Sequence, residues 1–281
     1  MVNYFLIYFG SVPKYLKYTV KAIKSSDENS KIYLLSDDQL DMDGVTNFSL
    51  EDIKGSKTKE VLSSNYYKSQ INPLWNTSMA RIFAIKDIAN YLDINNDIIH
   101  FDADVLIYDD FNKYKNKFDS LKGLHITQTN SDELIFGFSY INDMTIFEKI
   151  CTAMYRKLFE SENIANKSNL DTKNYSFNEM RMLREVEGEN EGYIFPITSV
   201  PTKKEDIIFD PIDIGYFLGG QDKYENVPTI DSRNYLGEYI LNDKSNSRIE
   251  FVDKKPFLIS HGIENKIFNI HVHNKKLINY L

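Results

Sequence analysis

The sequence predicts an α/β fold, in which a Rossmann-like βαβ unit begins a mixed central sheet flanked by helices. Three observations support this class. A strand, a helix and a second strand follow one another within residues 5–36, and a second helix leads into an apolar strand over residues 76–101. Beyond residue 120 the pattern loosens into strands and helices of mixed order, which is typical of α+β structure. With 281 residues, 42% of them hydrophobic, the chain is long enough to bury a large core.

The first unit begins with the apolar run of residues 5–9, which predicts a buried strand. Residues 10–13 form a turn in which Ser11 is the expected N-cap of a helix, and residues 31–36 form the next strand. A strand–helix–strand unit this short implies parallel strands and a right-handed crossover. Ligands of such sheets bind beyond the carboxyl ends of the strands. Here those ends carry Phe9, Gly10 and Asp37.

The remaining elements follow from periodicity and turn residues. They are a strand at 45–50, a helix that starts near the polar cluster 76–78, a strand at 98–101, strands at 123–127 and 134–141, a helix at 144–160, a polar loop at 163–176, a short helix at 178–187, strands within 193–209, a hairpin at 248–259 turning at Asp253-Lys254, and a final strand at 267–273. Because the composition does not shift along the chain, one domain is expected over residues 1–281, with halves at 1–110 and 111–281.

Charge and composition argue against several classes of protein. The 33 Lys and Arg residues face 41 Asp and Glu residues, and the net charge of −8 argues against a DNA or RNA binder. The single cysteine, Cys151, excludes a disulfide framework, and its apolar helical surroundings predict a small buried residue. No apolar run reaches the ~18 residues of a membrane span. The apolar start of the chain lacks the basic region of a signal peptide, so we expect a cytoplasmic protein without a transmembrane segment.

An Asp-x-Asp motif, Asp102-Ala103-Asp104, follows the apolar strand at 98–101 and precedes a further apolar run. On an extended backbone both carboxylates point to the same side. Two carboxylates that converge in an apolar segment repel each other and lose hydration unless a cation lies between them. Oxygen ligands suit Mg²⁺ or Mn²⁺, which keep open positions for phosphate oxygens. The alternative is a turn in which one aspartate caps a helix and the other is solvated.

Two histidines, His271 and His273, lie in the expected last strand. Because they are two residues apart, both point to one face of that strand. An imidazole beside two carboxylates completes a site that Mn²⁺ accepts better than Mg²⁺ does. The alternative is a surface strand with two solvated histidines.

Two further charged residues and a glycine pair are also candidates. Arg81, one of only six arginines, lies in the helix before the Asp-x-Asp motif. Its guanidinium either reaches a diphosphate or an aspartate of the site, or lies on a solvated helix face. Glu179 begins a helix, where it either complements the helix dipole or activates an acceptor hydroxyl. The pair Gly219-Gly220 would allow a loop to close over a substrate.

Together these residues resemble the GT-A-fold, metal-dependent glycosyltransferases that use nucleotide sugars. The resemblance rests on the opening βαβ unit, on the Arg81 helix leading into Asp102-Ala103-Asp104, and on His271-Val272-His273, while residues 130–260 match only loosely. It implies that Asp102, Asp104 and one of the two histidines hold a divalent cation, usually Mn²⁺ or else Mg²⁺, as in glycogenin-like enzymes. It also implies which residues contact the nucleotide sugar. These are Phe9, Gly10, Asp37, Arg81, Asp102, Ala103, Asp104 and Lys275.

The implied reaction moves a sugar, expected to be a hexosyl group of a UDP-sugar donor, to a hydroxyl of a glycan, glycolipid or glycoprotein acceptor. Negative charge on the leaving diphosphate would be stabilised by the cation held at Asp102 and Asp104, and by Arg81 or Lys275. An inverting enzyme also needs a carboxylate base, for which Glu179 is the candidate.

Two other classes of function remain open. A phosphatase of the haloacid-dehalogenase type also carries Asp-x-Asp after an apolar strand, and Asp102 would be its nucleophile. That motif normally lies on the first strand, whereas here it follows about a hundred residues. A non-catalytic sugar-binding protein would bind its ligand without turnover.

Overall fold

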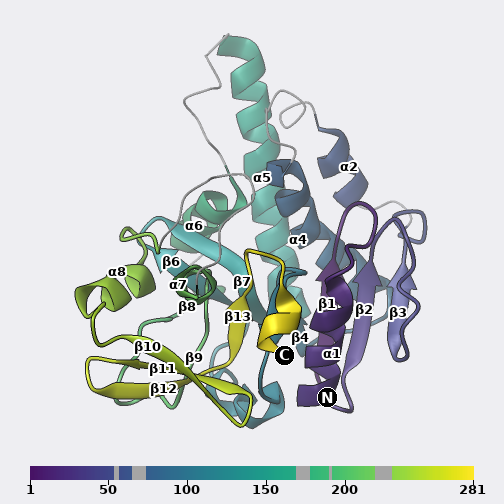
Figure 1. Cartoon of the computed structure of the whole chain (residues 1–281). Helices are drawn as coiled ribbons and strands as arrows, with labels where there is room; N and C mark the ends of the chain where they lie inside the picture. Colours follow the sequence, from purple (N-terminus) through teal and green to yellow (C-terminus); the bar gives the residue numbers. More distant parts are fainter. Residues whose placement is uncertain (54–56, 65–73, 169–177, 190–191, 219–229) are drawn as a thin grey trace.

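The computed structural model describes residues 1–53, 57–64, 74–168, 178–189, 192–218 and 230–281 (Figure 1). Its centre is a seven-stranded sheet in the order β3-β2-β1-β4-β7-β6-β8. The bounds are β1 (Asn3–Ile7), β2 (Lys31–Leu35), β3 (Val45–Phe48), β4 (Ile98–His100), β6 (Leu124–Asn130), β7 (Glu133–Ile141) and β8 (Ile194–Ile197). The first four strands run parallel, β7 is antiparallel to both of its neighbours, and β8 is parallel to β6. The sheet is therefore mixed, as predicted.

Helices cover both faces of this sheet (Figure 1). They are α1 (Leu16–Ser26) on one face and α2 (Lys57–Ser63), α4 (Leu74–Tyr91), α5 (Met144–Ser168) and α6 (Glu179–Glu189) on the other. Two further helices, α7 (Asp213–Phe217) and α8 (Tyr235–Asn242), pack in a separate hydrophobic cluster. Phe5 and Ile7 of β1 pack into the core shared with α4 and α5, whereas Tyr4 and Leu6 pack with α1 on the other face. Because both faces are buried, β1 is a continuous apolar run rather than an alternating one.

Two smaller sheets lie beside the central one (Figure 1). The first has the order β10-β11-β12-β9, and the second pairs β13 with β5. Their bounds are β9 (Ile207–Ile208), β10 (Arg248–Val252), β11 (Lys255–Ser260), β12 (Ile263–Ile267), β5 (Val105–Ile107) and β13 (Asn269–His271). The β10–β11 hairpin turns at Asp253-Lys254, as predicted, with positive φ at both residues, which suits a two-residue hairpin turn. The β5–β13 pair matters most for the site, because it sets His271 opposite Val105, the residue that follows the Asp-x-Asp motif.

The start of α1 differs from the prediction. The helix begins at Leu16 with Tyr15 as its N-cap residue, and no side chain caps it, so the expected cap by Ser11 is wrong. The amide of Leu16 instead donates to the carbonyl of Pro13, 3.0 Å away. A backbone turn thus supplies the acceptor that a serine cap would have provided.

Three further boundaries differ. The polar cluster 76–78 lies inside α4, where Thr77 donates to the carbonyl of Leu74 rather than capping the helix. Helix α5 continues to Ser168, past the predicted end at 160, because polar residues such as Glu, Asn and Lys do not by themselves end a helix. The predicted loop at 163–176 therefore begins inside α5, and its remainder lies outside the described residues. The predicted last strand is divided between β12 and β13.

Cys151 is buried in α5, where burial raises the pKa of its thiol, in agreement with the predicted apolar role. Within the described ranges, no helix combines the length and apolar character needed to span a membrane.

Candidate metal centre and adjoining pocket

Three side chains that can bind a cation meet beyond the carboxyl end of β4. They are Asp102, Asp104 and His271, and one possible ligand atom from each lies within 4.8 Å of the other two. The motif forms a turn, in which the amide of Val105 donates to the carbonyl of Asp102, rather than the extended segment we expected. The two carboxylates still converge, because the turn leads directly into β5 and β5 pairs with the strand that carries His271.

The imidazole of His271 provides the test of whether a cation fits. Its Nε2 lies 3.1 Å from Oδ2 of Asp104, and its Nδ1 lies 4.0 Å from Oδ2 of Asp102. That Nδ1 is buried and has no hydrogen-bond partner among the described residues. A cation between the imidazole and the carboxylates would satisfy this nitrogen, and carboxylate with imidazole is a donor set that Mn²⁺ accepts. The three residues therefore fit a divalent cation.

Each carboxylate of the pair also contacts a cationic side chain. Arg81 of α4 donates to Oδ1 of Asp102, and Lys275 donates to Oδ2 of Asp104. Burial alone would raise the pKa of the Asp104 carboxyl, but the charges of His271 and Lys275 hold that pKa well below its usual range. Burial disfavours the charged form of His271 and alone would lower its pKa. The negative charge of Asp104 outweighs this effect, and the pKa of His271 is raised. Each negative carboxylate of the motif thus has a positively charged side chain in contact with it.

Arg81 links Asp102 to Glu179, the residue expected as a base. Its Nη2 donates to Oε1 of Glu179 over 3.1 Å, and the Glu179 side chain is only 3% exposed. Burial raises the pKa of this carboxyl, and the charge of Arg81 opposes the shift. The other oxygen, Oε2, is buried without a hydrogen-bond partner within the described part of the chain. Glu179 therefore lies at the site as a partner of Arg81, and its role as a base stays a prediction.

The residues expected to hold the nucleoside lie together at the carboxyl ends of β1 and β2. The amide of Asp37 donates to the carbonyl of Gly10 over 3.1 Å, and Phe9 packs against the core beside them. Gly10 has φ of +125°, a conformation that side-chain-bearing residues rarely adopt. The ammonium of Lys275 lies 5.9 Å from the ring centre of Tyr15, at the start of α1. Tyr15 thus joins this βα turn to the metal centre, a role that sequence reasoning missed.

His273 has surroundings different from those of His271. Its ring stacks on His271 at 4.4 Å, although His273 lies in the turn after β13 and not, as we had expected, on the strand. However, its Nε2–H donates to the carbonyl of Ile212 over 2.9 Å, and the ring stacks on Tyr216 of α7 at 3.8 Å. Burial lowers the pKa of His273 to about 3. His273 lies outside the three-residue cluster and packs against α7.

A buried aspartate that the sequence analysis missed contacts this strand. Asp210 accepts hydrogen bonds from the amides of Ile214 (3.0 Å) and His271 (3.1 Å). Burial raises its pKa to about 6. The available signal was a pair of acidic residues, Asp210 and Asp213, within an apolar run, where an unsupported charge is costly. The nearby glycine pair at 219–220, singled out as a closing loop, lies outside the described residues.

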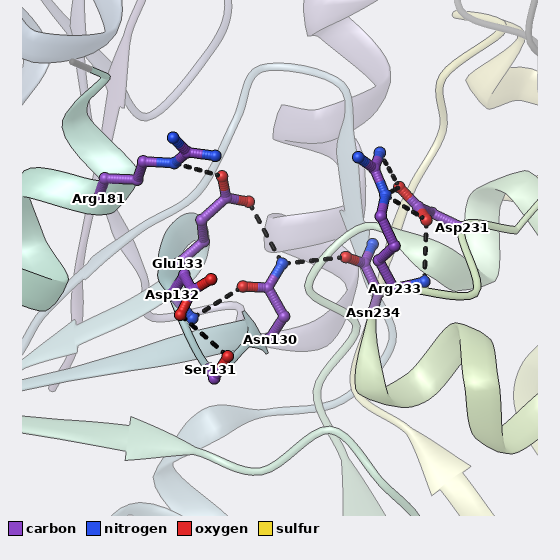
Figure 2. A pocket seen from close by; sticks show the side chains of 8 residues that line it. All are labelled: Asn130, Ser131, Asp132, Glu133, Arg181, Asp231, Arg233 and Asn234. Atoms are coloured by element: carbon purple, nitrogen blue, oxygen red, sulfur yellow. Dashed lines mark hydrogen bonds and ion pairs between the residues drawn. The ribbon is translucent and has the colours of Figure 1, made fainter. Parts of the chain in front are cut away.

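A pocket of about 350 Å³ lies next to α6, the helix whose Glu179 contacts Arg81 of the metal centre (Figure 2). It is lined by polar side chains from the β6–β7 turn, α6 and the segment before α8, namely Asn130, Ser131, Asp132, Glu133, Arg181, Asp231, Arg233 and Asn234. Each arginine is held by a carboxylate: Arg181 by Glu133 at 3.3 Å, and Arg233 by Asp231 through two of its nitrogens. Arg181 follows Glu179 by two residues in α6, so one helix serves both the pocket and the metal centre. No sequence motif indicated this pocket.

Neither a family model nor a curated protein matches the sequence. The solved structures that the chain matches include the galactosyltransferase LgtC in complex with donor and acceptor sugar analogues, which is 13% identical over 78% of this chain and 79% of its own, with a TM-score of 0.43. The glycosyltransferase GlyE of Streptococcus pneumoniae TIGR4 is 14% identical over 78% of this chain and 48% of its own, with a TM-score of 0.46. Mouse xyloside xylosyltransferase 1 is 10% identical over 72% of this chain and 89% of its own, with a TM-score of 0.45. All three solved structures are glycosyltransferases.

Proposed function

We propose that the protein is a metal-dependent glycosyltransferase of the GT-A type. It would transfer a sugar from a nucleoside-diphosphate donor, with UDP the first nucleotide to test, to a hydroxyl of a glycan or glycolipid. The observation that carries this proposal is the cluster of Asp102, Asp104 and His271 at the carboxyl edge of a parallel βαβ unit. Ligands of such sheets bind at this edge, and carboxylate with imidazole is a donor set for a cation that also binds phosphate.

The chemistry of the site follows from its charges. Transfer breaks the bond between the anomeric carbon and the diphosphate oxygen, forms a bond from that carbon to the acceptor oxygen, and releases the acceptor proton. When bound, Mn²⁺ or Mg²⁺ supplies positive charge for the diphosphate that leaves. Lys275 and Arg81 add two positive side chains beside the same carboxylates, so they can hold the leaving group without a large movement.

Glu179 holds Arg81 beside Asp102. Burial raises the pKa of the Glu179 carboxyl, and the contact with the guanidinium offsets only part of that rise. Transfer with inversion would require a base at the acceptor hydroxyl, for which Glu179 is the candidate, whereas transfer with retention would not.

The adjoining pocket supports a hydroxyl-rich acceptor. Its walls offer amide, carboxylate and guanidinium groups, and pairing within the walls leaves little net charge for a strongly ionic ligand. Groups of this kind, several of them with two parallel donors or acceptors, match neighbouring hydroxyls on a sugar ring.

The test is a thermal-shift and transfer assay with a panel of nucleotide sugars, with and without Mn²⁺. Asp104→Ala should abolish Mn²⁺-dependent UDP binding and sugar transfer, whereas Asp110→Ala, beyond β5, should leave both at the wild-type level. Unchanged UDP affinity and transfer in Asp104→Ala would contradict the proposal. Release of phosphate from simple monoesters without a nucleotide would instead support the phosphatase, and binding without turnover would support a sugar-binding protein.

A further inference from the structure

One edge of β13 is paired and its other edge carries the amide of His271. On the paired edge, Val272 donates to the carbonyl of Asp104, and Tyr108 donates to the carbonyl of Phe268, each over 2.9 Å. Because residues in antiparallel strands alternate between bonded and non-bonded positions, the amide of His271 points away from β5. Within the described residues, β13 has no second strand beside it. Some other group must therefore satisfy that buried amide.

Asp210 is that group. Its side chain is fully buried, and while one oxygen accepts from the amide of His271, the other accepts from the amide of Ile214 in α7. Asn269, also fully buried, fixes the backbone of Asp210 through two hydrogen bonds of 2.8 and 3.2 Å. The carboxylate thus joins the strand of the candidate ligand to α7 at a single point.

The packing around Asp210 leaves the strand little freedom to shift. A Cβ added at Gly215 of α7 would overlap the carbonyl oxygen of His271, so helix and strand are in direct backbone contact. The ring of His273 also packs between His271 and Tyr216. His271 is therefore held by β5 on one side, where the Asp-x-Asp motif lies, and by Asp210 and α7 on the other.

A carboxylate is required at this position because both of its oxygens accept. An asparagine has only one acceptor oxygen, and its NH₂ group would face one of the two amides. The neighbouring Asp213 is an internal comparison, since it is equally buried and lies on the same segment. Its Oδ1 accepts from Asn234 over 3.1 Å, toward the adjoining pocket.

We propose that Asp210 is a positioning residue, which sets His271 against Asp102 and Asp104 and so determines the affinity for the cation. The inference rests on the cation site of the proposed function. Without the acceptor, the amide of His271 is left buried and unsatisfied, and the strand moves to reach another partner. Substituting the outer partners of metal ligands typically lowers metal affinity about 10–100-fold.

The experiment is a Mn²⁺ titration of the purified full chain in the presence of UDP, followed by electron paramagnetic resonance. Asp210→Asn should lower the Mn²⁺ affinity about 10–100-fold, and Asp213→Asn should keep the wild-type affinity. Equal affinity in Asp210→Asn and wild type overturns the inference and leaves the proposed function standing. Equal losses in both variants overturn it as well, because a general loss of packing then explains the effect. If the wild type binds no Mn²⁺, the proposed function fails together with the inference.

A second readout separates positioning from stability. In the metal-free protein labelled with ¹⁵N-histidine, the ring signals of His271 should shift in Asp210→Asn and stay in place in Asp213→Asn. Should Asp210→Asn not fold, Asn269→Ala takes its place, because it loosens the backbone of Asp210 and keeps the carboxylate. A folded Asn269→Ala protein with wild-type Mn²⁺ affinity would overturn the inference.

Discussion

Lys275 donates a hydrogen bond to Oδ2 of Asp104, a residue 171 positions earlier in the sequence, and His271 approaches the same oxygen to 3.1 Å. The ammonium group therefore lies where a cation bound by Asp104 would repel it. A cation bound by Asp104 would thus compete with the Lys275–Asp104 pair, and under the proposed function the released lysine would be available to the phosphate groups of the donor.

Replacing Lys275 should separate cation binding from catalysis. Lys275→Met removes the competing charge, so the affinity for Mn²⁺ without nucleotide should rise or stay constant. The turnover number should fall by about two orders of magnitude, which is typical for the loss of one group that stabilises a developing negative charge. Mn²⁺ titration and steady-state kinetics measure the two effects, and Lys276→Met, one residue further and exposed, is the matched control. A parallel loss of Mn²⁺ affinity would count against the competition.

Arg81 and Glu179 should behave as a coupled buried pair. Arg81→Met leaves Glu179 buried beside an apolar side chain and should lower the free energy of unfolding by about 3–5 kcal/mol. The double variant Arg81→Met/Glu179→Gln should recover much of that stability but not the activity, because Asp102 still lacks its guanidinium. Urea unfolding of the two single variants and the double variant gives the coupling. Additive losses would show that the pair is not coupled.

Gly215 should tolerate no side chain. Gly215→Ala adds a methyl group that overlaps the carbonyl of His271, so α7 and β13 must separate. We expect both thermal stability and Mn²⁺ affinity to fall. Gly188→Ala in α6 is the matched control, since its added methyl meets no atom within 4 Å. In a helix that change should stabilise the protein by about 0.5–1 kcal/mol. A Gly215→Ala protein with wild-type Mn²⁺ affinity would refute the close contact.

Asp213 predicts a specific pH dependence of stability. Burial, reinforced by the charge of Asp210, raises the pKa of Asp213 to about 8. At pH values between the unfolded pKa of about 3.9 and 8, the folded chain holds a proton that the unfolded chain has released, so rising pH favours unfolding. Asp213→Asn should remove this slope and be more stable than the wild type at pH 8 and above. Denaturant unfolding at several pH values measures the difference, and parallel pH profiles for the two proteins would contradict it.

The pocket should affect the acceptor and not the donor. Arg181→Ala removes a guanidinium from the pocket wall and leaves Glu179 in place, so the KM for the acceptor should rise while Mn²⁺-dependent UDP binding stays constant. Arg248→Ala, in the β10–β11 hairpin, removes a similar exposed charge and should change neither quantity. Weaker UDP binding in Arg181→Ala would place the pocket on the donor side instead.

The sequence was most informative where buried strands end in polar residues. The apolar runs of β1 and β4 and the residues after them indicated the sheet edge, because only a strand buried on both faces is apolar throughout. Asp102 and Asp104 lie together with His271 beyond the end of β4, but on a turn, so the alternation of an extended strand from which we predicted their convergence does not apply there.

Two contacts of the site could not be derived in this way. Asp210 acts through its contact with the backbone of β13, and Tyr15 through a contact with Lys275, and neither contact leaves a periodic trace in the sequence. The two histidines looked equivalent because alternation fixes only the face of a strand. Their difference comes from α7, which engages His273 and leaves Nδ1 of His271 beside Asp102.

Because β5 pairs with β13, the residues of the site are synthesised at very different times and can assemble only late. On the ribosome, Asp104 is synthesised long before His271, which follows it by 167 residues. The ion-binding set can therefore form only after almost the whole described chain has been made and β13 has docked. Until then Arg81, which is made before either aspartate, can already neutralise Asp102. Under the proposed function, binding of the ion would therefore show that β13 has docked.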